Sequence, residues 1–112
     1  MVKAPSSAAR DGLRGTAPKL VEFTERVVFG EVWEGEELSK RDRSLITVTT
    51  LVALGHERQL RGHLQRALYN GVTREEIIGV ITHLAFYAGW PRAMTGATIA
   101  KEVFAELDAE EK

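Results

Sequence analysis

The sequence predicts an all-α protein of about five helices joined by short loops. Apolar residues recur at the three-to-four-residue spacing of amphipathic helices, and glycine and proline stand where such helices would begin or end. The chain has 112 residues, 44% of them hydrophobic, which is enough for one domain with one continuous core. We expect a loose, flexible arm over residues 1–16, a helical domain over 17–108 and a solvated tail over 109–112.

The first half of the chain predicts two helices and a connection between them. In "APKLVEFTERVVFG" the apolar residues have helical spacing, and Gly30 would end the helix. "EVWEGEEL" follows as a short, turn-rich connection, and Ser39 then resembles an N-cap. The β-branched run in "RSLITVTTLVALG", residues 43–55, favours a strand locally. Its length, its lack of alternation and its final Gly55 favour instead a helix buried on nearly every side.

Three further helices have clearer boundaries. "HERQLRGHLQRALYNG" is amphipathic, and Thr73 and Glu76 form a capping box that starts the next helix. Pro91 suits the first turn of the last helix, over residues 91–107. Glycines would end the first two of these helices, at Gly71 and Gly89. Small residues would let the last helix approach its neighbours closely: Ala93, Gly96, Ala97 and Ala100.

Composition and charge argue against several classes of protein. Lys and Arg number 15 and Asp and Glu 16, for a formal net charge of −1, so neither a nucleic-acid nor a membrane partner is indicated. Cysteine is absent, which excludes disulfides, thiolate nucleophiles and cysteine-ligated metals. No apolar run approaches the ~18 residues of a membrane helix, and the first sixteen residues lack the apolar stretch of a secretory signal. We therefore expect a cytoplasmic protein.

Four ordered blocks carry a further signal: "FGEVW", "RSLITVTTLVALG", "LRGHLQRALYNGVTREEI" and "THLAFYAGWPRAM". Together, from about Phe29 to Phe104, they resemble the carboxymuconolactone decarboxylase family. The resemblance implies an alkylhydroperoxidase D-like (AhpD-like) helical bundle that assembles into dimers, trimers or hexamers. A homo-oligomer agrees with the residues themselves, because two of the expected helices are too apolar for a lone small bundle to cover.

The resemblance also implies an activity. His63 aligns with the histidine of the superfamily motif C-x-x-C-x-x-x-H, but the cysteine positions fall on His56 and Gln59, so thiol peroxidase chemistry is not expected. The "LRGHL" and "FGEVW" blocks resemble the true decarboxylase instead. That lyase converts 4-carboxymuconolactone into 3-oxoadipate enol-lactone in protocatechuate breakdown (the β-ketoadipate pathway). That lyase needs no metal or organic cofactor. The expected binding partner of this chain is therefore a small-molecule substrate, a lactone dicarboxylate.

The implied chemistry calls for an acid and a cation. Loss of CO2 pushes electrons into the lactone carbonyl, after which a carbon must be protonated. His63, beside the apolar stripe of its helix, is the candidate acid, and Arg43, at the start of the central helix, is the candidate anchor for the carboxylate that stays. Alternatively, the histidine is a hydrogen-bonded core or interface residue, and Arg43 pairs with Asp42 or Glu37 at the surface.

Four other residues are candidates with simple alternatives. Glu31 could act as a base or tune His63, and Trp33 could form part of an apolar wall. The alternatives are a capping glutamate and a packing tryptophan. His83 and Tyr87 share one helix face and could bind substrate or, as we favour, lie at a subunit interface. The three histidines lack metal-ligand spacing, so no metal site is expected.

Two other readings of the chain stay open. One is a non-catalytic or differently catalytic oligomeric homologue, for example the partner of a redox or cupin-type protein. The other is a DNA-binding helix-turn-helix around "GVTREEI", which the balanced charge and the lack of a basic stripe disfavour.

Overall fold

The computed structural model describes residues 2–111 and confirms the all-α prediction. Met1 and Lys112, at the outer ends of the expected arm and tail, lie outside the described residues. The helices are α1 (Ala8–Asp11), α2 (Pro18–Phe23), the π-helix η1 (Thr24–Val32), α3 (Lys40–Leu54), α4 (Glu57–Tyr69), α5 (Arg74–Tyr87) and α6 (Trp90–Glu110). Among residues 2–111, no helix combines the length and the apolar character that a membrane span requires.

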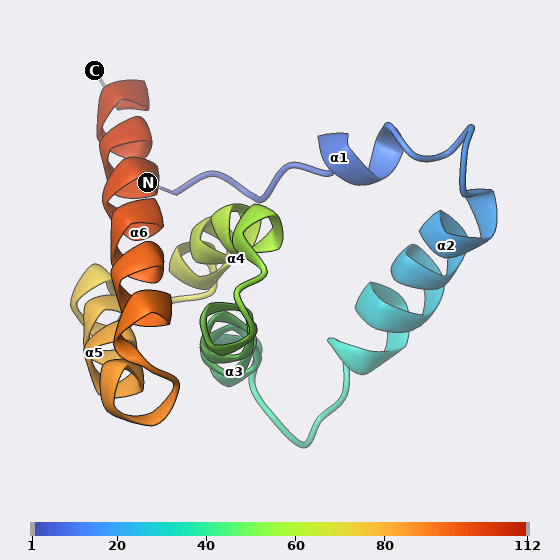
Figure 1. The fold of residues 1–112 in the computed structure, drawn as a ribbon. Helices are drawn as coiled ribbons and strands as arrows, with labels where there is room; N and C mark the ends of the chain where they lie inside the picture. The colour runs from blue at the N-terminus through green and yellow to red at the C-terminus, as the bar shows by residue number, and fades with distance from the viewer. Residues whose placement is uncertain (1, 112) are drawn as a thin grey trace.

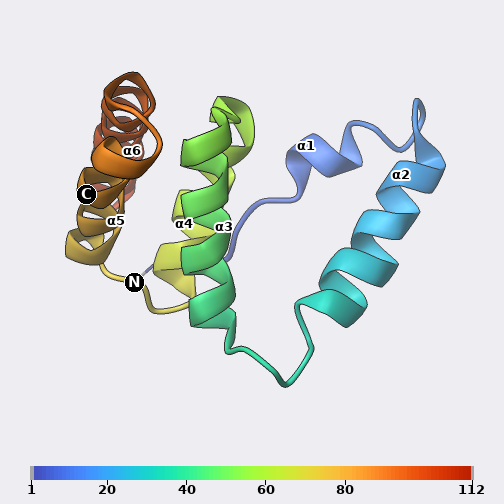
Figure 2. The same ribbon diagram turned by 60° about the horizontal axis from the view of Figure 1, so that its bottom comes forward.

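Helices α3 to α6 form a bundle, and α2 with η1 forms a separate rod (Figure 1). Helix α3 packs along α4, α5 packs along α6, and α6 also contacts both α3 and α4. Figure 2 shows the same order from another direction, with the α3–α4 pair between the α5–α6 pair and the rod. The rod makes few backbone contacts with the bundle, so its position depends on side chains that reach across from both.

The hydrophobic core lies inside the four-helix bundle and contains apolar side chains of α4 and α5 spaced as an amphipathic helix requires. A Cβ added to Gly96 of α6 would lie 3.2 Å from a methyl carbon of Val52 on α3. The close approach predicted from the small residues of the last helix is therefore confirmed. The buried core residues are Val48, Val52, Leu60, Leu64, Ala67, Val72, Ile77, Ile81, Leu84, Ala93, Ile99, Ala100, Val103 and Leu107.

Most helix ends agree with the prediction. The Ser39 hydroxyl accepts a hydrogen bond from the Asp42 N–H (3.0 Å) at the start of α3. At the start of α5, the Glu76 N–H donates to the Thr73 hydroxyl (3.1 Å) and the Thr73 N–H donates to the Glu76 carboxylate (2.9 Å), so the capping box is complete. Three glycines follow helices with positive φ: Gly55, Gly71 and Gly89.

Two predicted helix ends are wrong. Gly30 does not end the first predicted helix, because the helix widens to π geometry and continues to Val32. The Trp33 N–H donates to the Val28 carbonyl, five residues back (2.9 Å), and η1 thus takes the first residues of the expected connection. The last helix runs to Glu110 rather than ending at residue 107.

The prediction that residues 43–55 are buried on nearly every side is also wrong. Only one stripe of α3 is fully buried, consisting of Ser44, Val48 and Val52. Ile46 and Leu54 are 52% and 58% exposed, because α4, α5 and α6, which all contact α3, leave these side chains uncovered. The opposite side of α3 is left with apolar side chains in solvent.

Candidate active site

His63 stacks on the indole of Trp33. Their ring centroids are 6.1 Å apart and their planes differ by 28°. Helix α4 holds His63 next to the fully buried Leu64, and the residue after η1 brings the buried Trp33 beside it. The imidazole itself is only partly buried, but its Nδ1 is buried and has no hydrogen-bond partner within the described chain. The fold therefore brings together two residues that the sequence singled out separately.

Burial is the main cause of a lowered pKa at His63, because a partly apolar environment disfavours the charged ring. Repulsion from Arg66, one turn further along α4, lowers the pKa of His63 in addition. Arg66 is also partly buried, and burial and then the charge of Arg10 lower its own pKa. In the free protein the imidazole is therefore mostly neutral at pH 7.

Trp33, Phe29 and Arg66 line a hollow of about 380 Å³ between α4, η1 and the amino-terminal segment. The Arg66 guanidinium carbon lies 4.3 Å from the Phe29 ring centroid and 5.7 Å from the Trp33 centroid, within the range of cation–π attraction. The sequence analysis overlooked Arg66. Its spacing of three residues from His63 places both on one face of α4 and was the available signal.

The remaining predicted site residues do not meet at His63. The Arg43 side chain is 13% exposed, and its Nη2 donates to a Glu37 carboxylate oxygen (2.9 Å) and to the Gly35 carbonyl (3.3 Å). This is one of the pairings weighed as the alternative to substrate binding. Glu31 is exposed near the end of η1, and within residues 2–111 no hydrogen bond joins it to His63.

His83 and Tyr87 form a stacked pair on α5, with ring centroids 4.5 Å apart. Both are exposed, Tyr87 by 77%, and neither lines the hollow beside Trp33. Whether they bind substrate stays a prediction, as does the role of Glu31. In the part of the chain that the structure describes, no three His, Asp or Glu side chains gather in a way that could hold a metal ion.

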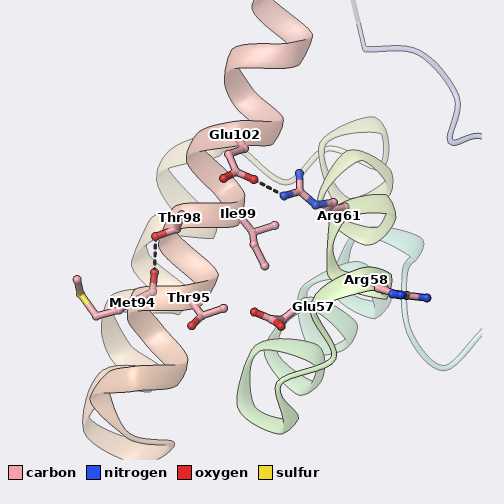
Figure 3. A pocket seen from close by; sticks show the side chains of 8 residues that line it. All are labelled: Glu57, Arg58, Arg61, Met94, Thr95, Thr98, Ile99 and Glu102. Atoms are coloured by element: carbon pink, nitrogen blue, oxygen red, sulfur yellow. Dashed lines mark hydrogen bonds and ion pairs between the residues drawn. The ribbon is translucent and has the colours of Figure 1, made fainter.

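A larger hollow of about 640 Å³ lies between α4 and α6 (Figure 3). Arg61 of α4 pairs there with Glu102 and Glu106 of α6, and Glu57 points into the space. Two arginines and two glutamates line it, Arg58, Arg61, Glu57 and Glu102, so its charges balance. No histidine lines either hollow, but the hollow beside Trp33 has three cationic side chains against one carboxylate, and Trp33 itself stacks on His63. The hollow beside Trp33 is therefore the better candidate for a dianionic substrate.

Comparison with known proteins identifies the family. Residues 18–102 match the model of the carboxymuconolactone decarboxylase family. The chain belongs to this family. The resemblance predicted from the four sequence blocks is thus confirmed. The matched region contains η1, the residue that follows it and α4, which supply Phe29, Trp33, His63 and Arg66, whereas Arg10 lies before it.

Three curated relatives share different levels of sequence identity with this chain. It is 42% identical over 85 residues to 4-carboxymuconolactone decarboxylase of Acinetobacter baylyi, which covers 76% of this chain and 63% of that protein. It is 33% identical over 84 residues to an uncharacterized 15.0 kDa protein of Paracoccus denitrificans (73% and 63%). It is 28% identical over 79 residues to nitrosuccinic acid decarboxylase of Metarhizium robertsii (70% and 55%). The chain therefore spans less than two thirds of the length of each of these relatives.

Proposed function

We propose that this chain is a cofactor-independent carboxy-lyase that decarboxylates a small lactone dicarboxylate in the hollow beside Trp33. The observation that carries the proposal is a partly buried imidazole, with an unpaired ring nitrogen, stacked on a wall of an aromatic and cationic hollow. Two of the matched relatives are named as decarboxylases, which supports the reaction class. The first substrate to test is 4-carboxymuconolactone, with 3-oxoadipate enol-lactone as the product.

In the proposed reaction, the bond between a ring carbon and its carboxylate breaks and CO2 leaves. The electron pair moves through the ring double bond to the lactone carbonyl oxygen, and His63 then delivers a proton to a ring carbon. The imidazole of His63 must be protonated for this step. A bound dianion favours the imidazolium form of a neighbouring histidine, so substrate binding would supply the charge that the free protein lacks.

The two carboxylates of such a substrate need different surroundings. The departing carboxylate loses its charge in the transition state, so a strong cation beside it would stabilise the ground state more. The indole of Trp33, which stacks on His63, offers it an apolar wall. Nitrosuccinic acid and 4-carboxymuconolactone, the substrates named for two relatives, both keep one carboxylate after losing CO2. A cation is needed to hold the carboxylate that stays, and Arg43 is the residue predicted for this role from the sequence.

Incubating the purified chain with 4-carboxymuconolactone, and following enol-lactone formation by chromatography, tests the proposal. We expect turnover by the wild type and a decrease in kcat of about 100-fold or more for His63→Gln. His56→Gln is the matched control, because His56 is exposed at the start of α4 and should leave the rate unchanged. Absence of turnover by the folded wild-type chain would overturn the proposed function. Equal rates for wild type and His63→Gln would remove His63 as the acid.

A further inference from the structure

We propose that Arg66 of α4 binds the carboxylate that the substrate keeps, and that the rings of Phe29 and Trp33 support its guanidinium. This assignment rests on the proposed decarboxylase function and gives that function its anion-binding residue. The ligand class is a small dicarboxylate whose ring carbon to be protonated lies near His63.

Geometry places Arg66 and His63 around the same indole. Arg66 follows His63 by three residues on α4, so both side chains leave the same helix face. The Trp33 ring centroid lies 6.1 Å from that of His63 and 5.7 Å from the Arg66 guanidinium carbon. The two residues stand about one turn apart along α4. A dicarboxylate held at one end by the cation can thus bring its reacting carbon toward the acid.

Among residues 2–111, the charges around the hollow leave Arg66 without a counter-ion. Two other basic side chains line the hollow, and both have carboxylate partners: Arg10 with Glu25 (3.3 Å) and Lys40 with Glu34 (2.7 Å). Within the described residues, no carboxylate pairs with Arg66. The guanidinium is partly buried and close enough to Arg10 for repulsion to lower its pKa. An unpaired cation removed from water is costly, and a bound carboxylate would supply the missing charge.

Arg43 fits the carboxylate role less well. Its Nη2 is occupied by Glu37 and by the Gly35 carbonyl, and its Nε is buried, without a hydrogen-bond partner among residues 2–111. A Cβ on Gly35 would lie 2.8 Å from Arg43 Nη2, so the side chain packs closely on the connection between η1 and α3. We infer that Arg43 holds this connection, which begins with Trp33, and thereby supports the hollow from outside.

The first arm of the test is kinetic. We expect Arg66→Gln to raise the KM for 4-carboxymuconolactone about 10- to 100-fold, as for the loss of a charged hydrogen bond. Arg66→Lys should recover part of this loss, because lysine keeps the charge without the planar fork. Arg58→Gln is the matched control, an exposed arginine of the same helix that points away from α6 in Figure 3, and it should keep the wild-type KM.

The second arm needs no turnover. The three histidines give few imidazole NMR signals, and His63→Gln identifies that of His63. We expect succinate, a dicarboxylate with no group that can accept electrons on CO2 loss, to shift this signal and to raise the pKa of His63. Dimethyl succinate should do neither, and Arg66→Gln should abolish the response while Arg58→Gln retains it.

The two arms separate the possible failures. Turnover by the wild type, with a normal KM and a normal succinate response in both Arg66 variants, would overturn the assignment and leave the lyase standing. No turnover, with a succinate response that depends on Arg66, would overturn the lyase and support the anion site. A larger rise in KM for Arg43→Gln than for Arg66→Gln would also overturn the assignment.

Discussion

His63 has its electrostatic state set by two neighbours of different kinds. The packing around Trp33 removes the ring from water, and the guanidinium of Arg66 repels a proton from it. The same guanidinium is the proposed attachment point for the substrate. An anion that neutralises Arg66 therefore removes part of the repulsion at His63. In this proposal, substrate binding and protonation of His63 are coupled through the side chain of Arg66.

The coupling predicts a pH dependence. If imidazolium is the acid, kcat/KM should fall as the pH rises through the free-protein pKa of His63, which lies below its ordinary ~6.5. Arg66→Gln removes a repulsive charge, so the pKa of His63 rises and the fall in kcat/KM moves to higher pH. The pH profiles of wild type, Arg66→Gln and Arg58→Gln measure this. A fall that moves to lower pH in Arg66→Gln alone would contradict the sign of the coupling.

At the scale of single elements, the start of α5 depends on a closed pair of hydrogen bonds. Thr73 and Glu76 satisfy each other's backbone N–H groups, which would otherwise lack intrahelical partners. The start of α5 also bonds to α3, because the Glu76 carboxylate pairs with Arg41. On its inner face, by contrast, α5 buries the apolar side chains of Ile77 and Ile81.

We predict that Thr73→Ala lowers the free energy of unfolding by about 1 kcal/mol, as loss of an N-cap does elsewhere. Thr82→Ala is the control, because Thr82 is exposed in the middle of the same helix and alanine is at least as good a helix former there. Urea unfolding followed by circular dichroism at pH 7 measures both. Equal destabilisation by the two substitutions would show that the cap contributes nothing of its own.

For the whole molecule, the main feature is the amount of apolar surface outside the core. At the corner between α5 and α6, Phe86, Trp90 and Met94 are 74%, 57% and 60% exposed, and Phe86 meets Trp90 edge to face at 5.3 Å. The α2–η1 rod exposes a second set, with Leu20 at 59% and Val32 at 52%. Exposed apolar surface of this kind is typical of a protein that is covered by a partner.

We therefore expect the chain to associate with copies of itself, in keeping with the homo-oligomer predicted from the sequence. Sedimentation velocity at micromolar concentration should give a species heavier than one chain. The double substitution Phe86→Ser and Trp90→Ser should shift it to lower mass, while Thr82→Ser, an exposed change on the same helix, should not. A wild-type chain that sediments as a monomer at this concentration would contradict the expectation.

Much of the fold could be predicted because its signals are local. The N-cap Ser39, the Thr73–Glu76 capping box and the glycines after three helices act through residues at most four positions away. The stripes of α4 and α5 follow from the helical period alone. Gly30 misled the prediction because the switch to π geometry depends on hydrogen bonds five residues apart, for which the sequence has no comparable signal.

The sequence by itself determined the helices, most of their ends and the family resemblance, and it singled out the imidazole ring of His63 as a candidate. Only the tertiary structure decided which residues surround that ring. Trp33 lies thirty positions before His63, and no spacing rule relates the two. Arg66 became a candidate only when Phe29 and Trp33 were found beneath it, and Arg43 proved to be engaged with Glu37 across a connection. Local patterns specify helices, but the environment of a charge depends on atoms that only folding brings within a few ångströms.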